Sequence, residues 1–217
     1  MSNFAEKQEF LLSQITDKSF HRRDLSGCDL GGIDLRAVDL SGINLIGADL
    51  RGANLSDAIL TGANLSGANL MQANLRNAYL YEASFCEANL VNADLRRANF
   101  CGAFLWRVKL CGSNLWGASL CDADLSEADL NEAQLIEASL IEANLVRANL
   151  TGAKLCGATL LEANLNQANL SGADLTSANL TEANLSEANL WETNLMNAKL
   201  QGAIMPDGTV HQLYIFY

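Results

Sequence analysis

Two histidines, His21 and His211, lie near opposite ends of the sequence, and no other side chain supplies an imidazole. Carboxylates are plentiful, but Asp or Asn recurs every five residues, as in Asp24, Asp29 and Asp34. Catalysis needs a few reactive groups that converge, whereas such regular recurrence is typical of a structural repeat. The sequence also has no glycine-rich phosphate loop, no activated-serine motif and no paired metal motif. We therefore predict no enzymatic activity and no cofactor-binding or metal-binding residues.

The net charge of −11 argues against a phosphate-binding surface, so we expect no nucleic-acid partner. Residues 21–110 carry nine acidic and nine basic side chains, whereas residues 111–217 carry thirteen acidic and three basic ones. No apolar run approaches the roughly 20 residues needed to cross a bilayer, and the N-terminus lacks signal-peptide features. The six cysteines match no zinc or redox motif and fit a reducing compartment. These observations predict a cytoplasmic protein with no membrane contact.

The sequence is organised by a five-residue repeat. Residues whose numbers are multiples of five, here called position 0, give 37 consecutive repeats from 20 to 200, all Leu except Phe20, Phe85 and Phe100. Position −2 is Ala in 29 of 32 repeats between residues 48 and 203. Asn or Asp dominates position −1, and Gly or Glu is common at position +2.

A period of five fits neither a helix nor an unbroken strand. Five residues at about 100° each would scatter the leucines around a helix, and an odd period sends alternate leucines to opposite faces of a strand. Both problems disappear if positions −2 and 0 point inward from a short strand and the chain turns a corner through position +2. Repeated turns then build a right-handed solenoid with coils about 4.8 Å apart.

The motif Ala/Ser/Thr–Asp/Asn–Leu–x–x, unbroken from about Arg23 to Leu200, resembles the pentapeptide-repeat family. The resemblance implies an all-β solenoid, a right-handed quadrilateral β-helix with four repeats and 20 residues per coil. It predicts about nine coils for residues 20–205. We expect residues 1–19 to form a capping helix, because Asn3 and Glu6 have capping-box spacing. Two degenerate repeats centred on Phe10 and Ile15 are the alternative.

We expect residues 206–217 to form a C-terminal capping tail. Pro206, Asp207 and Gly208 are typical of a turn. The apolar side chains of Leu213, Ile215 and Phe216 could then cover the final coil. A homodimer joined through this aromatic tail is compatible with either function discussed below.

A 20-residue coil places substitutions in columns along the rod. Apolar and aromatic residues then gather at outward positions near the middle of the chain, flanked by carboxylates. Two interpretations are open. Like residues in a column can simply stack and stabilise the sheet, or they can form a surface for a protein partner, because contiguous exposed apolar patches mark contact sites. The candidate partner-binding residues are Tyr79, Tyr81, Cys101, Phe104, Trp106, Trp116, Cys121, Ile136, Ile141 and Leu161.

Cys101 and Cys121 are the outward cysteines that this register stacks directly. Their Cα separation of about 4.8 Å permits a disulfide, but parallel side chains keep the Cβ atoms farther apart than the ~3.8 Å of a relaxed bridge. We expect two reduced thiols, and a redox switch is the alternative.

The resemblance implies two kinds of function. One branch of the family resembles a regulator of cyanobacterial cell differentiation that acts through protein contacts, and we favour such a non-enzymatic role with an unidentified protein partner. The alternative is a DNA-mimicking modulator of a type II topoisomerase, as in a second branch. Its candidate acidic ladder is Asp122, Glu142, Glu162 and Glu182. Rare Phe at position 0 and the absence of interrupting loops argue against mimicry.

Overall fold

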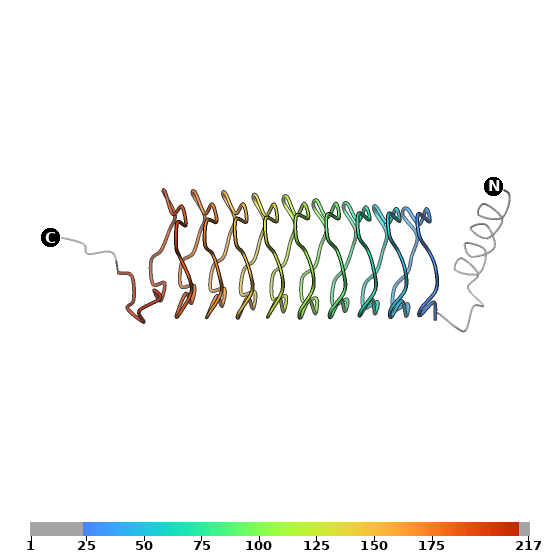
Figure 1. Cartoon of the computed structure of the whole chain (residues 1–217), viewed down its shortest axis with the longest axis horizontal. Coiled ribbons are helices and arrows are strands. Elements are labelled where there is room, and N and C mark those ends of the chain that lie inside the picture. Colours follow the sequence, from blue (N-terminus) through green and yellow to red (C-terminus); the bar gives the residue numbers. More distant parts are fainter. Residues whose placement is uncertain (1–23, 213–217) are drawn as a thin grey trace.

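A computed structural model of the protein describes residues 24–212, which form a straight rod of stacked coils (Figure 1). Parallel β-bridges join each residue at position −1 to the residue 20 positions later, from Asp24↔Asn44 to Asn184↔Ile204. This register confirms the prediction of four repeats per coil. Residues 24–203 make nine such coils. Within residues 24–212 the chain forms no helix, and every strand is a single bridged residue.

The core consists of positions 0 and −2, as the period predicts. Between Leu35 and Leu185, every position-0 side chain is at most 1% exposed, and the Ala residues at position −2 are equally buried from Ala48 to Ala183. Phe85 and Phe100 replace Leu at position 0, and their rings pack edge to face with centroids 5.5 Å apart. Burial of these two columns is the main driving force for the coil, since the outer positions remain polar.

Each corner is a tight turn formed by positions +1 and +2. The C=O of position 0 accepts a hydrogen bond from the N–H of the following position −2, as from Cys28 to Leu25 at 3.1 Å. Every residue at position +2 between Gly27 and Gly202 has a positive φ, whether it is Gly or not. A positive φ at this third turn residue is the signature of a type II turn, and it explains why Gly is common there.

The backbone N–H groups of one repeat can be accounted for completely. Position −2 donates within the turn, position −1 donates to the preceding coil, and positions 0 and +2 donate to the following coil. The N–H of position +1 has no backbone acceptor and instead bonds to a side chain. In repeat 48–52 the five pairs are Ala48 to Leu45 O, Asp49 to Cys28 O, Leu50 to Asn69 O, Arg51 to Asp49 Oδ1 and Gly52 to Met71 O.

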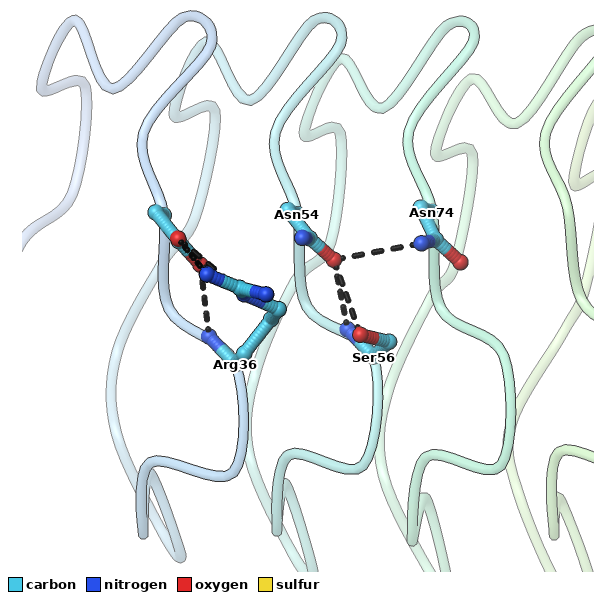
Figure 2. A network of polar contacts seen from close by, with 5 residues as sticks. Arg36, Asn54, Ser56 and Asn74 are labelled. Carbon is cyan, nitrogen blue, oxygen red and sulfur yellow. Dashed lines mark hydrogen bonds and ion pairs between the residues drawn. The ribbon is translucent and has the colours of Figure 1, made fainter.

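That side-chain acceptor explains the Asn and Asp residues at position −1. Every Asp or Asn at this position from Asp24 to Asn194 accepts a hydrogen bond from the N–H two residues later, at 2.9 to 3.3 Å. Figure 2 shows one such Asx turn, in which Asn54 Oδ1 accepts from the Ser56 N–H at 3.2 Å and from the Asn74 amide of the next coil at 3.2 Å. We call this side-chain acceptor the Asx cap.

The last described residues turn back on the final coil. Ile204 and Val210 form an antiparallel bridge, and the Gly202 N–H donates a hydrogen bond of 2.8 Å to the His211 C=O. The hairpin turns at Pro206–Gly208. It therefore pairs with part of the strand edge that the last coil would otherwise expose. The predicted capping helix at residues 1–19 and the tail side chains at 213–217 lie outside the described residues and stay predictions, as does dimerisation through the tail.

The inward–outward register can be tested with two adjacent residues. Leu105 is fully buried and Phe104 is 52% exposed. Leu105→Asn should lower the free energy of unfolding by about 3–5 kcal/mol, because it leaves a cavity and a buried amide. Phe104→Asn restores the usual residue of position −1 and should cost less than about 1 kcal/mol. Urea unfolding of both variants checks this, and equal losses would contradict the register.

Candidate protein-interaction surface

The Asx cap is missing at twelve residues of position −1, and half of them share one face of the rod. Their column also includes Asn99 and Asn179, which keep the cap. We call the part of this column that runs through the middle of the rod the Asx-poor face. Parallel bridges join its members in succession: Ile59, Tyr79, Asn99, Ser119, Ser139 and Thr159.

Apolar residues at position +1 line both corners of the Asx-poor face. The 20-residue register places Tyr81, Cys101, Cys121, Ile141 and Leu161 in one corner column, here called the cysteine corner. The other corner carries Trp116, Ile136 and Cys156. The structure thus gathers eight of the ten candidate partner-binding residues around one face. Phe104 and Trp106 belong to the next face and its far corner.

The exposure of these residues differs along the rod. Tyr79, Tyr81 and Phe104 are 55%, 46% and 52% exposed, whereas the other seven candidates are half-buried. Ile59, 38% exposed, precedes Tyr79 in the same column and was missed by sequence reasoning. The signal that would have found it is the absence of Asp or Asn at position −1. Ile59, Tyr79 and Tyr81 expose large apolar side chains in the N-terminal half of the surface, and Met196, 64% exposed, does so at the C-terminal end of the corner that carries Trp116.

The two candidate tryptophans are partly covered by basic side chains. The Arg107 guanidinium carbon lies 4.4 Å from the centre of the Trp106 ring, and that of Arg97 lies 4.7 Å from the Trp116 ring. Both distances fit cation–π contacts. These rings are consequently less available to a partner than Tyr79 and Tyr81.

The missing caps leave backbone donors along the cysteine corner. Cys121, Ile141 and Leu161 follow Ser119, Ser139 and Thr159 and therefore lack the Asx cap. The Ile141 N–H bonds to the Cys121 sulfur instead. No acceptor within residues 24–212 takes the N–H of Cys121 or Leu161, so these two groups are open to water or to acceptors of a partner.

Thiols and hydroxyls form a continuous contact chain beside these N–H groups. Cys101 Sγ lies 3.0 Å from Ser119 Oγ, which lies 3.6 Å from Cys121 Sγ, and Cys121 Sγ lies 3.2 Å from Ser139 Oγ. Both cysteines are free thiols in this structure. Burial raises the pKa of Cys121, but hydrogen bonds with Ser139, Ser119 and Cys101 together hold it below its usual value.

Carboxylates at position +2 run alongside the apolar residues of the cysteine corner. Glu82 forms a side-chain hydrogen bond that raises the pKa of the Tyr81 phenol. The predicted acidic ladder, Asp122, Glu142, Glu162 and Glu182, is exposed, and none of the four forms an ion pair within residues 24–212. Like charges about 4.8 Å apart repel one another, so this ladder costs stability.

The next corner compensates its charges instead. Its position +2 column reads Glu87, Arg107, Glu127, Arg147, Gln167 and Glu187. Arg107 lies 2.7 Å from Glu127 and 3.9 Å from Glu87, and Arg147 lies 3.7 Å from Glu127. Gln167 continues the contacts to Glu187 at 2.8 Å. The alternating column shows that the fold accommodates paired charges at this position, so the unpaired ladder is not imposed by the coil.

Groups suited to metal or membrane chemistry do not gather in the described part. Residues 24–212 contain no group of three or more His, Cys, Asp and Glu side chains able to hold a metal ion. None of their segments is a helix that could cross a membrane. A cavity of about 350 Å³ beside the C-terminal hairpin is lined by six residues: Thr181, Ala198, Lys199, Leu200, Gln201 and His211. It lies at the C-terminal end of the rod, where Thr181 and Gln201 continue the column of the cysteine corner beyond Leu161.

These features define a β-solenoid built from five-residue repeats, with one chemically distinct face. The family model for pentapeptide repeats matches eight times, and the chain belongs to this family, whose members form right-handed β-helices. The matched residues are 19–57, 39–77, 68–107, 78–117, 107–140, 133–172, 143–181 and 173–207.

Solved structures similar to the chain include HetL and QnrB1. HetL, a pentapeptide repeat protein involved in heterocyst differentiation regulation from the cyanobacterium Nostoc sp. strain PCC 7120, is 35% identical, with 88% of this chain and 94% of HetL covered and a TM-score of 0.50. QnrB1, a plasmid-mediated fluoroquinolone resistance protein, is 20% identical, with coverages of 87% and 89% and a TM-score of 0.51. The likeness to QnrB1 shows the fold alone. No curated protein matches the sequence.

The contrast between the two charged columns generates a paired prediction. Glu142→Gln relieves repulsion in the acidic ladder and should raise the midpoint of thermal unfolding. Glu127→Gln removes a partner of Arg107 and Arg147 and should lower it, with both effects within the ~1 kcal/mol typical of surface charges. Both shifts should shrink in 1 M salt because the charges are exposed. Shifts of the same sign would contradict the assignment of paired and unpaired columns.

Proposed function

We propose that the protein is a non-enzymatic scaffold that binds a protein partner through the Asx-poor face and the cysteine corner. The observation that carries the proposal is that two departures from the repeat, the loss of Asx caps and the gain of outward apolar side chains, occur on the same face. The face that loses most Asx caps also presents Tyr79 and Tyr81 to solvent and bears apolar residues along both corners. Contiguous exposed apolar groups of this kind mark contact sites.

The energetics support a functional reason for these departures. A hydrogen bond of this type stabilises a fold by about 0.5–1.5 kcal/mol, and the chain keeps it at every Asp and Asn of position −1 elsewhere. Loss of the cap in three successive coils at Ser119, Ser139 and Thr159 therefore lowers stability. At the same corner the N–H groups of Cys121 and Leu161 have no acceptor within residues 24–212, so they can serve a partner.

The surface also indicates the chemistry of the partner. Apolar side chains at position +1 run beside carboxylates at position +2, and backbone donors lie between the Asx-poor face and that corner. A matching segment presents apolar side chains, hydrogen-bond acceptors and Lys or Arg residues that face Glu142 and Glu162. Opposite charge would steer the encounter and fix the orientation of the bound segment.

The similarity to HetL supports a regulatory role within this class. That protein is involved in the regulation of heterocyst differentiation, and the two chains are alike over most of both lengths. We infer that this chain acts through contacts of its solenoid surface.

DNA mimicry by the acidic ladder is the weaker alternative. Its carboxylates repeat at about 4.8 Å, whereas phosphates repeat at about 3.4 Å along one DNA strand. One column of four charges covers only part of the rod, and the adjoining column is neutralised by Arg107 and Arg147. The geometry therefore favours a basic protein segment as the group that the carboxylates face.

Photo-cross-linking in the organism that encodes the chain tests the proposal. A photo-reactive phenylalanine analogue at Tyr79 should capture a partner, whereas the same analogue at the exposed Lys109, on the opposite side of the coil, should not. Replacing Tyr81, Ile141 and Leu161 together with Ser should reduce capture from position 79 at least about tenfold, as expected for loss of central apolar contacts.

The matched control replaces Met71, Val91 and Val146 with Ser. These are half-buried apolar residues of position +1 on other corners, so this triple variant should keep full capture. Equal capture by the two triple variants, or equal capture from positions 79 and 109, would contradict the proposed surface.

A further inference from the structure

We propose that Cys101 and Cys121 form a reversible disulfide site that responds to hydroperoxides. The two residues occupy the same corner on consecutive coils, and the Gly102 N–H bonds to the Cys121 C=O at 2.9 Å, which fixes their register. Both side chains are half-buried, so a small oxidant can reach them. This site is independent of whether the surface binds a protein partner.

One hydroxyl joins the two thiols. Ser119 Oγ lies 3.0 Å from Cys101 Sγ and 3.6 Å from Cys121 Sγ, and Ser139 Oγ lies 3.2 Å from Cys121 Sγ on the other side. The hydroxyls hold the sulfurs along one line on the corner. They can also donate to a thiolate, which favours the reactive form.

Among the described cysteines, this is the only pair stacked on one corner. Cys28 packs against the core, and Cys86, Cys111 and Cys156 occupy other corners. Their stacked neighbours one coil away are not cysteines: Ser66 and Trp106 for Cys86, Val91 and Asn131 for Cys111, and Ile136 and Thr176 for Cys156. These three thiols are therefore matched controls of similar burial.

Two opposing influences act on the thiols of the pair: carboxylates and burial disfavour the thiolate, whereas hydrogen bonds favour it. The carboxylates of Glu82, Asp122 and Glu142 lie on the same corner at position +2 and disfavour a thiolate. Burial also raises the pKa of Cys121, but its hydrogen bonds outweigh these effects and lower that pKa below the ordinary thiol value. Cys121 is accordingly the thiol that we expect to react first.

The chemistry needs one equivalent of a hydroperoxide. The Cys121 thiolate attacks the terminal peroxide oxygen, the O–O bond breaks, and water or an alcohol leaves after protonation, which gives a sulfenic acid. The Cys101 thiol then attacks the Cys121 sulfur, the S–S bond forms, the S–O bond breaks and water leaves. Two thiols lose two electrons and two protons, and the peroxide is reduced.

The coil geometry explains why the bridge should be easily reversed. Adjacent coils lie about 4.8 Å apart, whereas the Cβ atoms of a relaxed disulfide lie roughly 3.5–4.5 Å apart. The corner must therefore be drawn together when the bridge forms. Strained and accessible disulfides are reduced more readily than relaxed ones.

Peptide mapping of the full-length protein tests the site. Trypsin cuts after Arg97, Arg107 and Lys109, so Cys101 lies in peptide 98–107, and Cys121 lies in peptide 110–147 together with Cys111. After reduction, removal of the reductant and treatment with equimolar hydrogen peroxide, the two peptides should appear joined. Dithiothreitol should separate them again, and cross-linking should be lost in Cys101→Ser and Cys121→Ser but kept in Cys111→Ser.

Three results would overturn the proposal. The two peptides could stay separate while all thiols remain reduced, or Cys121 could proceed to the sulfinic acid without a bridge. The joined peptides could also persist in Cys121→Ser, which would place the bridge at Cys111. Circular dichroism of each Ser variant confirms that a lost cross-link does not reflect a lost fold.

Discussion

The rod depends on one backbone hydrogen bond that the coil itself cannot make. Four of the five N–H groups in a repeat find C=O acceptors in the turn or in neighbouring coils, but the N–H of position +1 faces outward. An Asn or Asp two residues earlier accepts it, and the amide of Asn residues such as Asn74 also bonds to the coil before (Figure 2). Because buried or half-buried backbone donors need partners, this side chain is as much part of the repeat as the inward Leu.

The need for an acceptor at position +1 also distinguishes structural from candidate functional residues on the surface of the rod. Where the Asx cap is present, the Asn or Asp side chain at position −1 already bonds to the backbone and has little freedom to contact a partner. Where the cap is absent, the repeat gives up a hydrogen bond and gains a side chain of another kind, such as Tyr79 or Ser119. Half of these departures share one face, beside the cysteine corner, the unpaired acidic ladder and the thiol pair, so much of the distinct chemistry of the rod lies around that face.

Much of this fold follows from the five-residue period. The inward Leu and Ala, the turn at position +2 and the columns along the rod could all be predicted, because period and side-chain direction are tied by backbone geometry. For Asn and Asp at position −1 the recurrence predicted only a structural role, since the missing N–H acceptor is apparent only when every hydrogen bond is traced. Coverage of Trp106 by Arg107 depends on side-chain conformations that spacing does not specify.

Residue-resolved amide hydrogen exchange tests the central claim most directly. Val91 and Val146 follow Asn89 and Asn144, whose caps accept their N–H groups at 3.2 and 3.3 Å. Ile136 is a half-buried β-branched residue at the same position, but it follows Gln134 and lacks the cap. After correction for intrinsic rates, the account predicts exchange roughly fivefold slower at the two valines, as one net hydrogen bond of about 1 kcal/mol implies. Equal protection of all three amides would contradict it.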